Sequence, residues 1–153
     1  MSEKSSHEQC LFCRIGKREV GAHVVYESEQ VMAFLDINPI RLGHIQVIPL
    51  RHFDYFDDLP PTVAAEILNV GQRLARALKI ACKVPRVAFL FTGGDVPHAH
   101  AHVVPMVEFD DITSRRYIVE EIVTYIDAPR AAEADLASCA VLIRNALLPL
   151  RVQ

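Results

Sequence analysis

The sequence predicts one compact α+β domain, and three observations support this prediction. First, the chain has 153 residues, 51% of them hydrophobic and 23% charged, which is enough to bury a core without disulfide bonds. Second, strand-like runs and helical segments can both be recognised along the chain. Third, the strands follow one another and the helices stand apart, a pattern typical of α+β rather than alternating α/β folds.

The first part of the chain predicts an irregular start and then two strands. Residues 1–9 are polar and predict a disordered tail, and residues 10–21 predict a short, turn-rich segment. The β-branched and aromatic runs 23–28 and 31–36 predict two strands that are joined by a hairpin. This hairpin is the expected start of the sheet.

A third strand and a long amphipathic helix come next. Residues 43–49 alternate in the manner of a half-buried strand that is ended by a proline. Asp58 is a candidate N-cap for the helix, with Pro60 and Pro61 in its first turn, and Pro85 lies beyond its end. Apolar side chains recur between them at helical spacing, at Val63, Ile67, Val70, Leu74, Leu78 and Ala81.

Two more strands and a second helix complete the expected elements. Residues 86–92 predict the fourth strand, residues 93–95 a tight turn, and residues 99–105 the fifth strand. Residues 112–127 do not specify an element type. Apolar residues at helical positions in the segment 131–148 predict a C-terminal helix.

Composition excludes several classes of function. A formal net charge of −3 and a pI near 6.1 provide no basic field for a nucleic-acid polymer. The N-terminus lacks the apolar core of a signal peptide, and no stretch has the length and hydrophobicity of a membrane span. Four cysteines, two of them as a Cys-x-x-Cys pair, suit a reducing compartment better than a disulfide framework. We therefore expect a soluble, cytoplasmic protein.

Three histidines alternate with alanines in the segment His98-Ala99-His100-Ala101-His102. Successive side chains of a strand point to opposite faces, so the histidines share one face and the alanines face the long helix. At about 3.3 Å per residue the Cβ atoms of the outer two histidines lie roughly 13 Å apart, too far for both rings to share one tetrahedral metal easily. At least one histidine therefore needs another role.

That role can be chemical. A neutral imidazole is a competent nucleophile toward phosphorus and also a proton shuttle, and phosphoryl chemistry uses both properties. The competing interpretation is a polar face on an edge strand. It explains one histidine well, but it explains three on one face poorly.

The segment HAHAHVV resembles the histidine triad pattern His-φ-His-φ-His-φ-φ, in which φ is apolar. The segments CLFCRIGKREV and VYESEQVMAFLDINPIRLGHIQVIPLRHF resemble the same family in the same order, so the likeness covers roughly residues 10–105. It implies a five-stranded antiparallel sheet with one long central helix, to which this chain adds the C-terminal helix. We therefore divide the chain into a disordered tail (1–9), a histidine triad (HIT) domain (10–108) and a C-terminal extension (109–153) whose helix packs on the domain.

The resemblance also implies a function. Family members act at the α-phosphate of purine nucleotide conjugates, either phosphoramidates or dinucleoside polyphosphates, as hydrolases or nucleotidyl transferases, and they are commonly homodimers. His100 matches the nucleophile that forms a covalent nucleotidyl-histidine intermediate. His102 would contact the phosphate or the leaving group and help to deliver a proton. His44 matches an additional histidine of the pocket, and no organic cofactor is implied.

The nucleotide-binding residues come from the same resemblance. Asp36 matches the position that hydrogen-bonds the ribose hydroxyls, and a carboxylate suits two such donors. The base slot matches four apolar residues, for which an ordinary place in the core is an equally good interpretation. These are Phe12, Ile15, Phe34 and Ile37.

A zinc site is implied as well. The pair Cys10-x-x-Cys13 alone could bind metal, be redox-active or be simply buried. Branches of the family, and the related galactose-1-phosphate uridylyltransferases, complete a zinc site with two histidines, which match His52 and His98. A Cys2His2 set of this kind is closed and therefore structural: it would clamp the N-terminal segment to the catalytic strand and leave His100 free.

The segment before the triad departs from the family pattern. Gly94 stands where many members have a glutamine, Asp95 where they have a hydroxyl, and Met106 where an arginine often follows the proline. An anion that faced the pocket would repel a phosphate, so the sequence does not specify the leaving group. Backbone N–H groups of Gly93 and Gly94 could cradle an anion or simply form a turn.

Two other functions fit parts of the sequence. A nucleotide-binding or partner-binding module with the same fold and little catalysis is suggested by Asp95 and the short loop. A cupin-type metalloenzyme would use His100, His102 and Glu108 as a two-histidine, one-carboxylate site. The long helix and the cysteine pair argue against the cupin.

Overall fold

The structure is a computed structural model that describes residues 9–94, 96–108, 111–112 and 128–148. The expected tail, except for its last residue, lies outside the described residues. So do Asp95 and residues 113–127 of the segment whose type was not specified. In chain order the elements are α2 (Leu11–Gly16), β1 (Val24–Glu27), β2 (Val31–Leu35), β3 (Ile45–Pro49), the 3-10 helix η1 (Phe56–Asp58), α3 (Pro61–Ala81), β4 (Arg86–Phe91), β5 (Ala101–Met106) and α4 (Glu133–Leu147).

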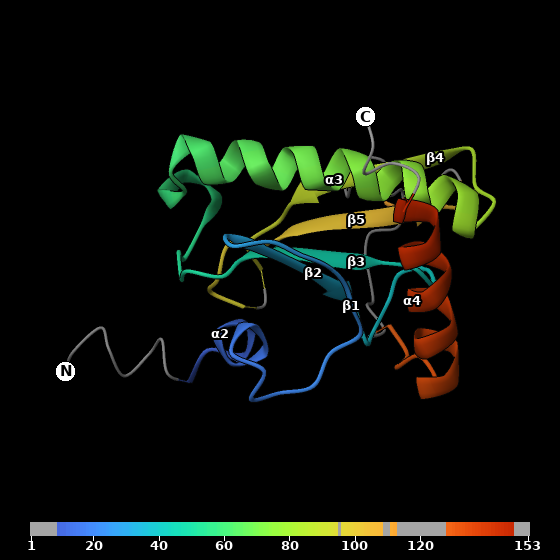
Figure 1. Cartoon of the computed structure of the whole chain (residues 1–153), viewed down its shortest axis with the longest axis horizontal. Helices are drawn as coiled ribbons and strands as arrows, with labels where there is room; N and C mark the ends of the chain where they lie inside the picture. Colours follow the sequence, from blue (N-terminus) through green and yellow to red (C-terminus); the bar gives the residue numbers. More distant parts are fainter. Residues whose placement is uncertain (1–8, 95, 109–110, 113–127, 149–153) are drawn as a thin grey trace, which may run out of the picture.

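The five strands form one antiparallel sheet in the order β1-β2-β3-β5-β4 (Figure 1). The hairpin between β1 and β2 closes at Ser28, whose N–H donates to the carbonyl oxygen of Val31 at 2.8 Å. Because β5 lies between β3 and β4, its residue His102 pairs with Gln46 of β3. The predicted α+β class, five-stranded antiparallel sheet and long helix are all confirmed.

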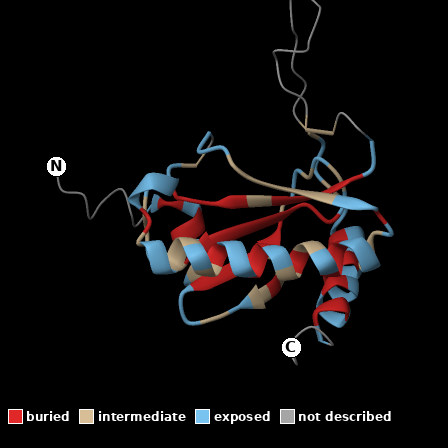
Figure 2. Cartoon of the chain, turned by 90° about the horizontal axis from the view of Figure 1, so that it is seen from above, coloured by how far each residue is buried: buried red, intermediate tan, exposed pale blue. Residues whose placement is uncertain are grey.

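The two faces of the sheet carry different elements. The long helix α3 crosses one face, and the short helix α2 lies below the other (Figure 1). Side chains of β3 divide between the faces by the alternation of a strand: Val47 joins the core under α3, whereas Ile48 packs with Phe12 of α2. Figure 2 shows the central strands buried and the outward side of α3 exposed. The larger core therefore lies between α3 and the sheet.

The C-terminal helix α4 stands at one end of the sheet and packs against α3 and β1 (Figure 1). Its buried side chains, Leu136 and Ile143 among them, belong to the main core. Arg144 donates through Nη1 to the carbonyl oxygen of Val24 at 2.8 Å. Before the helix, the N–H of Ala131 donates to the carbonyl oxygen of Ile37 at 2.8 Å.

Three local predictions were wrong. The segment predicted as turn-rich contains α2, whose inward side chains are held by packing under the sheet. Asp58 does not cap α3, which begins after Pro60. The carboxylate of Asp58 instead accepts the N–H of Tyr55 at 3.2 Å and so caps η1. The fifth strand begins at Ala101 rather than at residue 99 because the N–H of Ala99 donates to Phe53 at 2.6 Å, outside the sheet.

None of the helices in the described part of the chain is long and apolar enough to cross a membrane.

A close contact between α3 and β4 yields a prediction. A Cβ built on Gly71 would lie 2.2 Å from Cε2 of Phe89. Alanine favours a helix by about 1 kcal/mol over glycine, but the displaced ring outweighs this, so we expect Gly71→Ala to lower the free energy of unfolding by about 1–3 kcal/mol. Urea unfolding measures the change. Gly21→Ala, which meets no atom within 4 Å, is the control, and an unchanged midpoint in Gly71→Ala would contradict the packing.

Candidate functional site

The three triad histidines lie on the sheet face opposite α3, although only His102 belongs to β5. The rings of His98 and His100 both contact Phe12 of α2, with centroids 5.9 and 5.2 Å away. Ala99 and Ala101 point the other way, into the core under α3. The predicted division of the segment between the two faces is therefore present, with His98 and His100 placed by the chain leading into the strand.

His100 is held with one ring nitrogen occupied and the other available. Its Nδ1 lies 2.7 Å from the carbonyl oxygen of His98. A carbonyl can only accept, so Nδ1 carries the proton and donates it. The lone pair is then on Nε2. With His100 5% exposed and its ring braced edge-on by Phe12, the available nitrogen Nε2 has a defined orientation.

His44 and His102 form a hydrogen-bonded pair beside it. The N–H of Ile40 donates to Nδ1 of His44 at 3.3 Å, which places the proton of His44 on Nε2. That proton is donated to Nδ1 of His102 at 3.0 Å. Nε2–H of His102 is then the donor toward Oγ1 of Thr92 at 2.9 Å. The chain of contacts holds the His102 proton on the nitrogen that faces Thr92.

Burial keeps His44 neutral. Its side chain is almost entirely enclosed, and desolvation is the main cause that lowers its pKa below the ordinary 6.5. The neighbouring carboxylate of Asp36 acts in the opposite direction, and His100 adds to the lowering. A neutral His44 is consistent with a single proton on Nε2.

Asp36 lies at the edge of the same network. Its Oδ1 accepts the N–H of Asn38 at 2.7 Å, and its Oδ2 accepts Nε2 of Gln46 at 2.7 Å. Gln46 and Thr92 were not predicted as site residues. For Gln46 the sequence did carry a signal, because it is the one polar residue after His44 in an otherwise apolar strand. Thr92 has no such signal.

Three of the four predicted base-slot residues come together. Phe12, Ile15 and Phe34 are buried in one cluster on the α2 side of the sheet, and the rings of Phe12 and Phe34 meet edge-on at 5.6 Å. Ile37 is 43% exposed and lies outside this cluster. The three buried residues serve as packing for α2 whether or not they also meet a base.

The four predicted metal ligands form one cluster, here called the Cys–His cluster: Cys10, Cys13, His52 and His98. Their ligand atoms all lie within 4.8 Å of one another. Nδ1 of His98 is 3.5 Å from each sulfur, and Nδ1 of His52 is 3.2 Å from Sγ of Cys13. Tetrahedral zinc with ordinary bond lengths requires nitrogen–sulfur separations of about 3.6 Å. The donor set and the spacing therefore fit Zn²⁺.

Hydrogen bonds on the far side of each ring aim the two imidazoles. Nε2 of His98 donates to the carbonyl oxygen of Pro49 at 2.9 Å, and Nε2 of His52 meets Oδ1 of Asp54 at 2.8 Å. In both rings Nδ1 is thus turned toward the cysteines, as in the carboxylate–histidine–metal arrangement. Burial lowers the pKa of His98 to about 4, which keeps it a neutral donor.

The two thiols of the cluster can ionise together only if a cation lies between them. Burial is the main cause that raises the pKa of Cys13 to about 12, the adjacent Cys10 adds to it, and Lys17 opposes it. Ionising two adjacent buried thiols is unfavourable unless a positive ion lies between them. The chemistry of the donor set thus agrees with its geometry.

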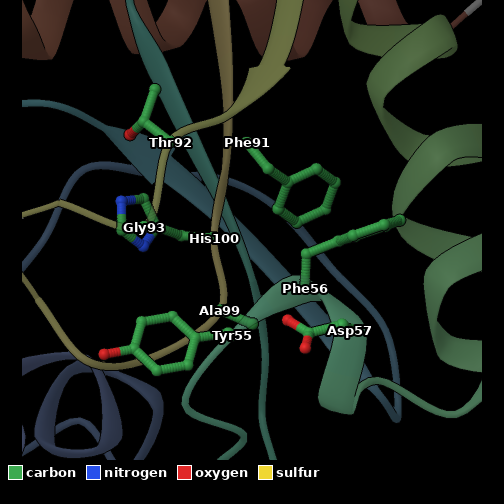
Figure 3. Close-up of a pocket in the computed structure, with 8 residues that line it drawn as sticks. All are labelled: Tyr55, Phe56, Asp57, Phe91, Thr92, Gly93, Ala99 and His100. Atoms are coloured by element: carbon green, nitrogen blue, oxygen red, sulfur yellow. The ribbon is translucent and has the colours of Figure 1, made fainter.

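A cavity of about 260 Å³ opens beside His100 (Figure 3). Its wall contains Tyr55, Phe56, Asp57, Phe91, Thr92, Gly93, Ala99 and His100. The rings of Phe56 and Phe91 lie together at one side, with centroids 4.7 Å apart, and Tyr55 lies on the side of His100. Among the residues that the structure describes, Asp57 is the one charged side chain of this wall, and no lysine or arginine lines it.

The cupin alternative is not supported. Glu108 is exposed, and the Cys–His cluster is the only group of three or more potential ligands that could hold a metal in the described part of the chain. An open sheet, rather than a barrel, carries His102.

Comparison with known proteins gives a consistent picture. A family model, the HIT domain, matches residues 17–109. An uncharacterised HIT-like protein of Methanocaldococcus jannaschii is 38% identical over 109 residues, which cover 66% of this chain and 81% of that protein. The adenosine 5'-monophosphoramidase of Saccharomyces cerevisiae is 32% identical over 97 residues, covering 63% of this chain and 61% of that enzyme.

A solved structure shares the whole architecture. The zinc-bound histidine triad family protein from Mycobacterium smegmatis superposes with a TM-score of 0.76 at 30% identity, over 95% of this chain and 97% of that one. The likeness therefore includes the C-terminal part of the chain as well as the matched domain.

The buried state of His44 predicts a pH dependence. Because its pKa is lowered on folding, the unfolded chain binds a proton below pH 6.5 that the folded chain does not, so stability falls as the pH drops below 6.5. An NMR titration should show the His44 ring still neutral at pH 6.5, and His44→Asn should flatten part of the stability profile. A His44 ring that is largely protonated at pH 6.5 would contradict this.

Proposed function

The chain belongs to the histidine triad family, and on this premise we propose that it is a nucleotide hydrolase or nucleotidyl transferase. Its substrates are purine nucleotide conjugates, on which it acts at the α-phosphate. The observation that carries the proposal is the hydrogen bond from Nδ1–H of His100 to the carbonyl oxygen of His98, which leaves the lone pair on Nε2. The yeast relative, an adenosine 5'-monophosphoramidase by name, supports the choice of substrate class.

The proposed reaction has two displacements. Nε2 of His100 attacks the α-phosphorus, a nucleotidyl-histidine bond forms, and the bond from phosphorus to the leaving group breaks. The leaving group takes a proton from Nε2 of His102, whose donor contact with Thr92 points it toward the cavity. Water then attacks the same phosphorus and gives a proton to Nε2 of His102, and the bond from phosphorus to His100 breaks. This releases the nucleotide and restores both histidines to their starting forms. His44 keeps His102 in the required tautomer.

The nucleotide itself lies against the remaining predicted residues in this proposal. Asp36 accepts the ribose hydroxyls with the lone pairs not used by Asn38 and Gln46. Phe12, Ile15, Phe34 and Ile37 border the base. The exposed Ile37 lies outside the buried cluster of the other three, so we assign it to the open side of the slot.

The cavity favours an amine leaving group. A polyphosphate tail carries several negative charges, and the described part of the wall beside His100 offers it Asp57 and no cation. An amine leaves as a neutral or positively charged group, which the carboxylate and the aromatic rings of Tyr55 and Phe56 accommodate. We therefore favour nucleoside phosphoramidates over dinucleoside polyphosphates.

We also propose that the Cys–His cluster holds a structural Zn²⁺. The separations between its donor atoms and the orientation of both imidazoles support it, as does the zinc-bound relative from M. smegmatis. A closed set of four protein ligands supplies folding stability and leaves no position for substrate. The ion would join α2 to His52 and to the residue that holds His100.

Chemical trapping tests the enzyme proposal. Protein quenched during turnover of an adenosine phosphoramidate should carry one adenylyl group on His100, and His100→Ala should lower kcat/KM by at least about 10⁴-fold. Mass spectrometry locates the adduct. In a panel that includes dinucleoside polyphosphates, the phosphoramidate should react faster because of the charge on Asp57.

His23→Ala is the control, since His23 lies outside the network and pairs with Glu133. It should leave turnover unchanged. Tight nucleotide binding, no adduct and turnover indifferent to His100→Ala would instead identify a binding module with the same fold.

Metal analysis tests the zinc proposal. We expect one Zn²⁺ per chain, retained in His100→Ala and lost in Cys13→Ala, with a fall in the unfolding temperature on chelation because the ion binds only the folded cluster. Cys82→Ala is the matched cysteine control and should keep the metal. Zinc that persists in Cys13→Ala would exclude the cluster as its site.

A further inference from the structure

Gln46 is a buried polar residue in the middle of β3. It is 6% exposed and is flanked on the sheet by Phe34 and His102, its partners on β2 and β5. It shares the site face with both, because strand alternation turns Ile45 and Val47 into the core under α3. An apolar side chain would suit the packing of this position better than an amide.

The amide bridges two functional groups. Its Nε2 lies 2.7 Å from Oδ2 of Asp36 and 3.2 Å from Nδ1 of His102. The amide nitrogen has two hydrogens, so it can donate to both acceptors at once. Its Oε1 is buried without a hydrogen-bond partner among the described residues. The side chain is therefore oriented by its two donor contacts at the expense of its acceptor.

We propose that Gln46 is a positioning residue that couples the ribose-binding carboxylate of Asp36 to the proton donor His102. The inference rests on the proposed function. Two donors converge on Nδ1 of His102, namely Nε2–H of His44 and Nε2–H of Gln46. A proton on Nδ1 would point at these donors, so this tautomer of His102 is disfavoured. The proton of His102 is held on Nε2, where it meets Thr92 at the cavity.

The same amide sets the carboxylate. Asp36 is 20% exposed at its side chain. Nδ1 of His44 lies 3.7 Å from Oδ2 but carries no proton, because it accepts the N–H of Ile40, so the amide of Gln46 is the donor that orients Oδ2. In this proposal the hydrogen bond from Gln46 fixes Oδ2, and the remaining lone pairs of the carboxylate accept the ribose hydroxyls. Gln46 thus positions both the carboxylate that binds the ribose and the histidine that gives the leaving group its proton.

The test is Gln46→Leu, with Gln46→Glu as a second variant that keeps the side-chain length but replaces the two-hydrogen amide by a carboxyl group, which can donate at most one hydrogen. Both should lower kcat/KM for an adenosine phosphoramidate by about 10- to 100-fold, with kcat and KM both affected. AMP should bind more weakly. In ¹⁵N NMR of the free protein, the wild type should show His102 protonated on Nε2, and the variants a mixture of both tautomers.

Gln46→Leu should be at least as stable as the wild type in urea, because it removes an unpaired buried oxygen. Gln72→Leu, on the exposed side of α3, is the matched control and should leave the His102 tautomer, the AMP affinity and kcat/KM unchanged. The proposal would be overturned if either folded variant kept the His102 tautomer, the AMP affinity and the kcat/KM of the wild type. It would also be overturned if His102 of the wild-type protein were protonated on Nδ1. The NMR result needs no turnover, so a protein without activity would refute the proposed function while still deciding the role of Gln46.

Discussion

The hydrogen bond from the His100 ring to the carbonyl oxygen of His98 is the constraint on which the site depends. It couples a backbone atom to the protonation state of His100, the proposed nucleophile. That backbone is itself held on its other side, because the ring of His98 is fixed between Pro49 and the cysteines of the Cys–His cluster. The cluster that joins the start of α2 to the sheet therefore also sets the conformation of His100.

The sheet separates stability from chemistry. Its α3 face is apolar and supplies most of the core, so the burial of residues such as Val47 and Leu74 drives folding. Its other face carries buried polar side chains, His44, Gln46 and His100, which an apolar core would not need. Such residues oppose stability unless every donor and acceptor is paired, and the unpaired Oε1 of Gln46 shows that pairing here is incomplete. Function is the physical reason to retain them.

The cavity wall beside His100 is negatively charged, which bears on the groups that can bind there. As far as the structure describes its wall, the cavity at His100 has Asp57 and aromatic rings but no cation, whereas a phosphate-binding wall needs donors or positive charge. In the proposed reaction, the histidines and backbone groups would hold the α-phosphate. The leaving group would then meet the negative, aromatic surface formed by η1 and the end of β4.

Local patterns in the sequence determined the class of fold, the long helix, the triad and the cysteine pair, because periodicity and motif spacing are properties of neighbouring residues. The start of β5 and the helix α2 were decided by tertiary contacts, such as that between Ala99 and Phe53, which override local propensity. The cap of η1 is a local contact between Tyr55 and Asp58, and it takes the carboxylate that was predicted to cap α3. Thr92 and Gln46 became site residues only when β4, β3 and β5 were placed side by side. The physical reason is that a hydrogen bond between side chains 56 positions apart, as from Gln46 to His102, exists only once the sheet has set its register.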